Sequence, residues 1–226
     1  LTEAGYDIKA RKPREKPLRK KEHEEERVKI CKNWIRKPAE YFSDDVDGIF
    51  DNKLWPIPTT DLGKEYVKKT KVRFHLRTPS EGVSPGFTKP GLKKNRVNPG
   101  SSVKVLAGIV DNKIRVWHYL PKGKWGGQMA ADAYRGVVIK TMRRQRGPKA
   151  SYRILEDNDP QGYKSELGIK AKKDCKIKAI PYPRYSPDLN PLDFFVWAEV
   201  GRRMRLQKAP RKESAEQYKA RLRRTA

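Results

Sequence analysis

Three aspartates occupy positions from which a fold could bring their carboxylates together. The segment VDGIFDNK (46–53) is a short strand candidate that delivers Asp51 at its end, and SYRILED (151–157) is a second strand candidate, with Asp157 at its end. Asp193 lies in the first turn of a helix expected from Asn190 onward. Hard cations such as Mg²⁺ require oxygen ligands, and two such ions about 4 Å apart can activate a nucleophile in phosphoryl chemistry. If the two strands are neighbours in a sheet, their carboxylates converge.

Each aspartate taken alone also has an ordinary structural interpretation. Asp193 is an acidic residue near the positive end of a helix dipole, where carboxylates are favourable without any ligand. Asp157 begins Asp-Asn-Asp-Pro, a sequence in which a side chain commonly caps a turn. Asp51 by itself is uninformative. The flanking residues therefore have to decide between structure and chemistry.

The residues around Asp193 are the most specific feature of the chain. Residues 182–200 read YPRYSPDLNPLDFFVWAEV, with Asn190 at a helix N-cap and Pro191 at the first helical position. This stretch closely resembles the third-carboxylate motif of mariner-type DDE/D transposases. LEDNDP (155–160) resembles the second motif of that family, in which Gln-Asp-Asn follows a buried strand. Counting 158 to 192, 35 residues separate the two aspartates, which suits the mariner-type group.

The resemblance implies a ribonuclease H-like α/β fold, a mixed sheet flanked by helices, with metal-dependent DNA strand cleavage and transfer. Asp51, Asp157 and Asp193 would then be the catalytic residues and the ligands of Mg²⁺ or Mn²⁺. The first motif is the weakest, because the family often has Asp-Glu where this chain has Asp51-Asn52. Lys164 and Ser165 also stand where the family often has His-Thr-Ser. The resemblance covers about Arg27 to Arg205 and includes no helix-turn-helix unit, so we expect no specific transposon-end recognition from this stretch.

The remaining pattern supports an α/β order of elements. We expect a polar helix from Glu22 that carries into VKICKNWI, and a strand at VRFHL (72–76). A hairpin of strands 103–110 and 114–120 follows, then a helix from Gln128 to about Arg146. A helix over about 163–172, a strand over 176–180 and the helix from Asn190 complete the core. The expected division is a basic arm with the start of a polar helix (1–29), a ribonuclease H-like core (30–205) and a basic tail (206–226), with both ends extended.

The charge of the chain points to a polyanionic partner. Lys and Arg number 53 against 27 Asp and Glu, a formal net charge of +26. Self-repulsion on this scale disfavours a compact state unless a polyanion neutralises it, and nucleic acid is the natural candidate. The cations that we expect to contact phosphates lie in a long basic loop, at one helix end and in the last helix: Lys93, Lys94, Arg96, Arg143, Arg144, Arg146, Arg202, Arg203 and Arg205. Trp117, Trp125 and Trp197 are expected to be core residues rather than base-stacking platforms.

Composition argues against other classes of protein. No apolar run is long enough to suggest a transmembrane segment, and no secretory signal is visible. Cys31 and Cys175 cannot form a zinc site at any usual spacing with the three histidines, His23, His75 and His118. Both thiols are expected to be small buried hydrophobic side chains in a reducing compartment.

Three functions remain open from the sequence. The first is an active transposase catalytic domain, which would act in the nucleus. The second is a domesticated, non-catalytic core that binds RNA within a large ribonucleoprotein such as a mitochondrial ribosome, with rRNA and neighbouring proteins as partners. The third is a nuclease of the same fold that cleaves without integration.

Overall fold

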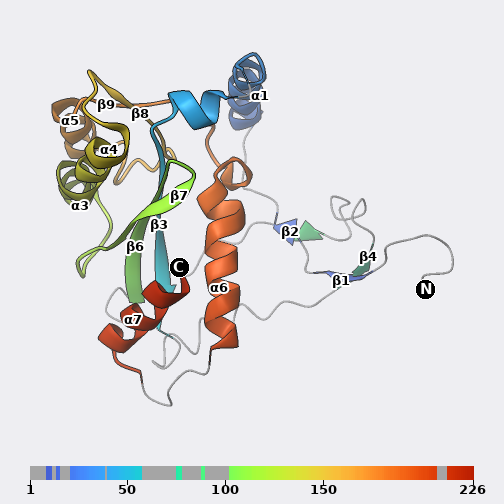
Figure 1. Ribbon diagram of the computed structural model, residues 1–226. Helices are drawn as coiled ribbons and strands as arrows, with labels where there is room; N and C mark the ends of the chain where they lie inside the picture. The colour runs from blue at the N-terminus through green and yellow to red at the C-terminus, as the bar shows by residue number, and fades with distance from the viewer. Residues whose placement is uncertain are drawn as a thin grey trace.

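The computed structural model describes residues 21–38, 40–57, 102–207 and 213–226 (Figure 1). It also gives the backbone of four short strands, paired as β1 (Lys9–Arg11) with β4 (His75–Arg77) and β2 (Arg14–Glu15) with β5 (Thr88–Lys89). Most of the predicted basic arm, the first three residues of the VRFHL strand, and Lys93, Lys94 and Arg96 lie outside the described residues.

A five-stranded mixed sheet forms the centre, in the order β7-β6-β3-β8-β9. The strands are β3 (Gly48–Pro56), β6 (Ser102–Val110), β7 (Lys113–Tyr119), β8 (Tyr152–Leu155) and β9 (Ile177–Ala179). The first three pair antiparallel, whereas β3-β8 and β8-β9 pair parallel. The predicted hairpin is confirmed: Asp111 and Asn112 turn the chain with φ of 55° at each, as a tight type I′ turn requires.

Helices cover both faces of the sheet (Figure 1). On one face, α3 (Gly127–Ala133) runs through the π-helical turn η5 (Tyr134–Val138) into α4 (Ile139–Arg146), and α5 (Glu166–Asp174) packs beside it. The core on this side includes Phe50, Tyr134 and Tyr163. On the other face lie the π-helical turn η7 (Leu192–Val196), α6 (Trp197–Leu206) and α7 (Ala215–Thr225). The predicted ribonuclease H-like α/β architecture is confirmed.

The ends of the described chain are more structured than the sequence pattern indicated. The predicted polar helix is confirmed as α1 (Lys21–Ile35), and its Trp34 packs on a third small cluster with Tyr41 and Tyr182. Residues 213–226 differ from the expected extended tail, because Ser214 caps α7 with a capping box and Tyr218 and Leu222 are buried in the core. The many basic residues of this segment made the apolar face of α7 hard to recognise in the sequence.

Other boundaries shifted by a few residues. The helix expected over 163–172 begins at Glu166, because the Ser165 hydroxyl accepts the Gly168 N–H as an N-cap. Trp197 is buried as predicted, and Trp117 and Trp125 are partly buried against the cores. Cys175 is buried and Cys31 is half-buried. None of the described helices is long and apolar enough to cross a membrane.

Candidate active site

Asp51 lies in the middle of β3 rather than at its end, which corrects the prediction. The antiparallel ladder between β3 and β6 pairs Asp51 with Ala107 and continues past Asp51 to Pro56, which pairs with Ser102. Alternation along the strand sends Phe50 to the α3–α5 face and Asp51 to the α6 face. There the Asp51 carboxylate, 6% exposed, accepts hydrogen bonds from Trp197 Nε1 at 2.6 Å and from the backbone N–H of Asn52 at 2.7 Å.

Asp157 follows the end of β8, as predicted. The parallel pairing of β3 with β8 ends at Ile49 opposite Leu155, and each aspartate stands two residues beyond that pair. Because side chains alternate along a strand, both carboxylates leave the sheet on the same side. Asp157 Oδ1 accepts the backbone N–H of Asp159 at 2.6 Å, which orders the turn after the strand. The turn-capping interpretation and the candidate ligand role therefore apply to the same side chain.

Asp193 comes from the helical element on the α6 face. The Asn190 side chain accepts the Leu192 N–H at 3.0 Å, and the Asn190 carbonyl accepts the N–H of Asp193 at 2.9 Å. Pro191 follows with φ of −59°, so the predicted Asn-Pro helix start is confirmed. This start fixes Asp193 in the first turn, where the helix dipole favours a carboxylate.

The three carboxylates act on one another electrostatically. Burial, followed by the charge of Asp193, raises the pKa of Asp51 to about 7, and Asp157 contributes further, against the hydrogen bond from Trp197. Burial raises the pKa of Asp157 to about 6, with contributions from Asp159, Asp193 and Glu156. Like charges gathered in a poorly solvated place disfavour their own ionisation. A cation held among them would relieve that repulsion.

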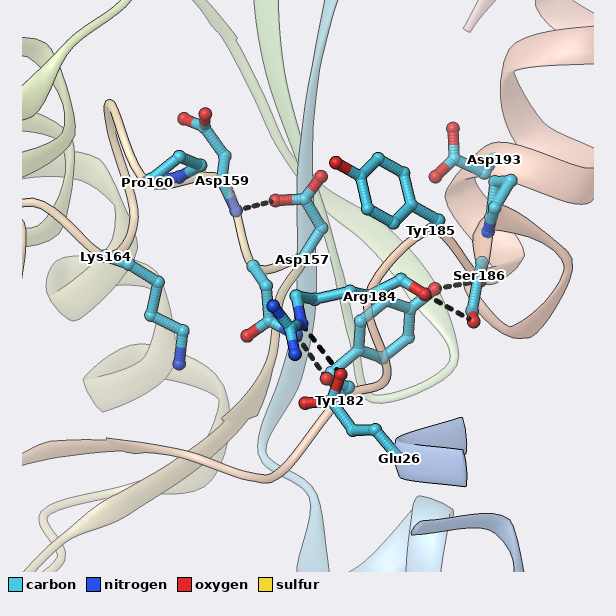
Figure 2. Close-up of a pocket in the computed structure, with 12 residues that line it drawn as sticks. Glu26, Asp157, Asp159, Pro160, Lys164, Tyr182, Arg184, Tyr185, Ser186 and Asp193 are labelled. Carbon is cyan, nitrogen blue, oxygen red and sulfur yellow. Dashed lines mark hydrogen bonds and ion pairs between the residues drawn. The ribbon is translucent and has the colours of Figure 1, made fainter. Parts of the chain in front are cut away.

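Asp157 and Asp193 line one cleft of about 700 Å³ (Figure 2). Lys164 stands on the α5 side of this cleft, and Arg184 and Tyr185 come from the segment before Asp193. Tyr185 is 55% exposed and takes a left-handed backbone conformation with φ of 52°, which is uncommon for a bulky residue. The cleft thus combines acidic, basic and aromatic side chains.

Helix α1 closes one side of this cleft. Glu26 accepts a hydrogen bond from Arg184 Nε at 2.8 Å, and Arg27 makes a two-pronged ion pair with Asp188 at 3.0 and 2.6 Å. The ring of His23 lies 4.8 Å from that of Tyr185. Asp188, in the turn before Asn190, is thus joined to α1.

A buried polar network lies behind Asp157, and the sequence pattern did not predict it. Glu156 is buried at 1% exposure and accepts hydrogen bonds from Lys172 Nζ and the Tyr134 hydroxyl. Burial raises the pKa of Glu156 and lowers that of Lys172, and the ion pair opposes both shifts. Lys172 carries no local signal of such a role in the sequence, because only the packing of α5 brings it to Glu156.

A second set of contacts joins the strand of Asp51 to the loop of Asp157. The Asn52 side chain donates to the Tyr163 hydroxyl at 2.9 Å, and the Tyr163 ring packs edge-on against Trp125. Trp125 Nε1 in turn donates to Asp159 at 2.7 Å. Asn52, which replaces the acid common at this position in the family resembled, is thereby a structural link between the two motifs.

The predicted phosphate-binding cations occupy several environments. Arg143, Arg144 and Arg205 are exposed. Arg146 donates to the carbonyls of Ser43 at 2.7 Å and Val46 at 3.4 Å, so it ties α4 to η1 (Tyr41–Asp45). Arg202 and Arg203 both pair with Glu199. These contacts give Arg146, Arg202 and Arg203 structural roles, and binding by any of the set stays a prediction.

The described residues include no group of three or more His, Cys, Asp or Glu side chains arranged closely enough to hold a metal ion. The three aspartates nonetheless fit a divalent cation in chemical kind. All are hard oxygen donors and all approach from the α6 side of the sheet, where burial and the charges of Asp193 and Asp157 already raise the pKa of Asp51.

The order of the five strands and the helices on both faces of the sheet are those of the ribonuclease H-like α/β fold class. Among proteins of this fold class, comparison with solved structures shows that the chain is similar to the mariner transposase catalytic domain. The Mos1 catalytic domain with Raltegravir and Mn matches with a TM-score of 0.58 at 14% identity, over 92% of this chain and 84% of that one. The Mos1 mariner paired end complex with Mn matches with a TM-score of 0.56 at 17% identity.

This match to the paired end complex covers 91% of the present chain but only 55% of the Mos1 chain. The Mos1 strand transfer complex matches similarly, with a TM-score of 0.52 and 18% identity over 89% of this chain and 51% of that one. No protein-family model and no curated protein matches the sequence. The similarity therefore establishes the fold.

Proposed function

We propose that this chain carries out metal-dependent phosphodiester chemistry on nucleic acid, as a transposase-type catalytic core that cleaves and transfers DNA strands. The observation that carries the proposal is geometric: Asp51 and Asp157 each stand two residues beyond the last β3-β8 pair, and Asp193, from the helix on the α6 face, lies near enough to act on both electrostatically. A fold maintained only for structure gains nothing from gathering three repelling carboxylates, because burying like charges costs stability. Such a cost is characteristic of functional sites.

In this proposal Asp51, Asp157 and Asp193 would hold Mg²⁺ or Mn²⁺, the ions named with the Mos1 structures. When bound, these ions would activate a nucleophile and stabilise the leaving oxygen of a phosphodiester. Trp197 orients Asp51 through its Nε1 hydrogen bond, and the turn N–H of Asp159 orients Asp157. Lys164 and Arg184, on the walls of the cleft, supply positive charge for the phosphates on either side.

The test is metal-dependent cleavage of labelled DNA by the full chain and by Asp157→Asn. We expect cleavage with Mg²⁺ or Mn²⁺ by the natural sequence and loss of about 10³-fold or more in the variant, with DNA affinity nearly unchanged. Asp132→Asn is the matched control, because Asp132 is exposed on α3 and does not line the cleft, so we expect cleavage by this variant to equal that of the natural sequence. No cleavage of any DNA by the natural chain, with either ion, would overturn the proposal.

A non-catalytic RNA-binding role within a ribonucleoprotein is the second candidate. Two observations favour it: the net charge of +26, and the absence of a ready-made ligand cluster among the residues that the structure describes. This role predicts that purified protein retains stoichiometric RNA and shows no response to Mg²⁺. Location would follow function, in the nucleus for the enzyme and in an organelle for the scaffold.

A further inference from the structure

A lysine-lined groove lies next to the carboxylate cleft, at the β9 edge of the sheet. The groove has a volume of about 560 Å³ and is formed by α5, by β9 and by the residues just before β8. Three exposed lysines line it, Lys173 at the end of α5, Lys176 in the turn and Lys178 on β9. None of the three forms an ion pair with a carboxylate of the described residues.

The groove and the carboxylate cleft share a wall. Lys164 lines both, and Figure 2 shows its side chain extending along the side of the cleft away from Asp193. A strand of phosphates that leaves the carboxylates, which approach from the α6 side of the sheet, therefore reaches the groove on the α5 side by passing Lys164. The buried cation of the wall, Lys172, is paired with Glu156, so the charge that faces the groove comes from the exposed lysines Lys173, Lys176 and Lys178.

The shape of the backbone keeps these lysines on the groove. Lys176 has φ of 58°, a left-handed conformation that ends α5 and reverses the chain into β9. Its N–H donates to the Lys173 carbonyl at 3.0 Å, and its carbonyl accepts the Tyr152 N–H at 2.8 Å. The turn that carries the charge is thus bonded to both the helix and strand β8.

We propose that this groove binds the sugar-phosphate backbone of the nucleic acid strand that continues from the scissile phosphate. The inference deepens the proposed function and rests on it for the identity of the scissile site. Exposed lysines with no carboxylate partner suit sequence-independent phosphate contacts, which position a strand without reading its bases. Lys164 connects the two parts of the path.

The test is the salt dependence of DNA binding by the full chain, followed by fluorescence anisotropy of a labelled DNA duplex. The variant is Lys173→Ala/Lys176→Ala/Lys178→Ala. If three phosphate contacts are lost, the slope of log K against log salt falls by about 2 to 3, and affinity at low salt falls by about tenfold or more. The matched control removes the same charge at the opposite edge and face, as Lys113→Ala/Arg223→Ala/Arg224→Ala, three exposed cations.

Equal losses of DNA affinity in the two variants would overturn the proposed groove, because the loss would then depend on net charge alone. An unchanged slope in the groove variant would overturn it as well. The stabilisation of each variant by Mn²⁺ in a thermal melt reports separately on the carboxylates, and we expect it to be unchanged in both. A specific loss of binding in the groove variant, together with absent cleavage by the natural chain, would support the groove and refute the catalytic proposal.

Discussion

Replacing Asp51 by Asn should stabilise the metal-free protein at alkaline pH. The Asp51 carboxylate is almost fully buried, and its pKa rises from 3.8 to about 7 on folding. A shift of this size corresponds to about 4 kcal/mol against the ionised form. Asparagine has nearly the same shape and no charge to bury, so it avoids this cost.

The sign of the pH dependence follows from proton binding. Between pH 3.8 and about 7 the folded state holds a proton on Asp51 that the unfolded state releases. The contribution of Asp51 to stability is therefore greatest below pH 3.8 and is lost as the pH rises through about 7. Asp157, with its pKa raised to about 6, acts in the same direction over a narrower range.

The net gain is smaller than the electrostatic cost alone. Asp51 accepts hydrogen bonds from Trp197 and Asn52 through different oxygens, whereas asparagine has one oxygen and must lose one of these bonds. A lost bond of this kind costs about 1 to 3 kcal/mol. We therefore expect Asp51→Asn to gain about 2 kcal/mol at about pH 8, equivalent to about 4 to 8 °C in Tm.

The assay is urea unfolding in EDTA at about pH 5 and about pH 8, with Mg²⁺ added back in a second series. We expect the variant to gain stability only at the higher pH and to lose most of the stabilisation that Mg²⁺ gives the natural chain. Asp132→Asn is the control, because Asp132 is exposed on α3 and should change neither value. A variant less stable than the natural chain at about pH 8 would refute the reasoning.

Two further substitutions test the supports of the site. Lys172→Met should lose about 3 to 5 kcal/mol of stability in urea unfolding, because it leaves the buried Glu156 carboxylate without its cation. Adding Glu156→Gln should restore part of this loss. If Lys172→Met alone stays within about 1 kcal/mol of the natural chain, about the cost of an ordinary hydrogen bond, the ion pair does not have the proposed role. Asn190→Ala should cost about 1 kcal/mol and weaken Mn²⁺ binding, since Asn190 caps the turn that holds Asp193. Ser214→Ala, which removes the cap of α7, should cost a similar amount without changing Mn²⁺ binding, and equal loss of binding in both would refute the positioning role.

Local sequence was sufficient wherever a short-range rule decides structure. Asn190 and Pro191 marked a helix start that the structure confirms, because the cap bonds and the fixed φ of proline involve only neighbouring residues. The Asp111-Asn112 hairpin was predictable for the same reason. The order of strands and helices, with the motifs around Asp157 and Asp193, likewise led to the correct fold class.

Tertiary structure decided how the carboxylates are aligned, how deeply they are buried and how their pKa values shift. The sequence placed Asp51 at a strand end, but pairing with β6 carries the strand on to Pro56, and only the shorter parallel pairing with β8 aligns Asp51 with Asp157. The raised pKa of Asp51 depends on burial and on Asp193, which is 142 positions later by 193 − 51. The ion pair of Lys172 with Glu156 and the packing of α7 also join residues whose meeting no local pattern encodes. The residue types came from the sequence, and their distances and desolvation came from packing over long range.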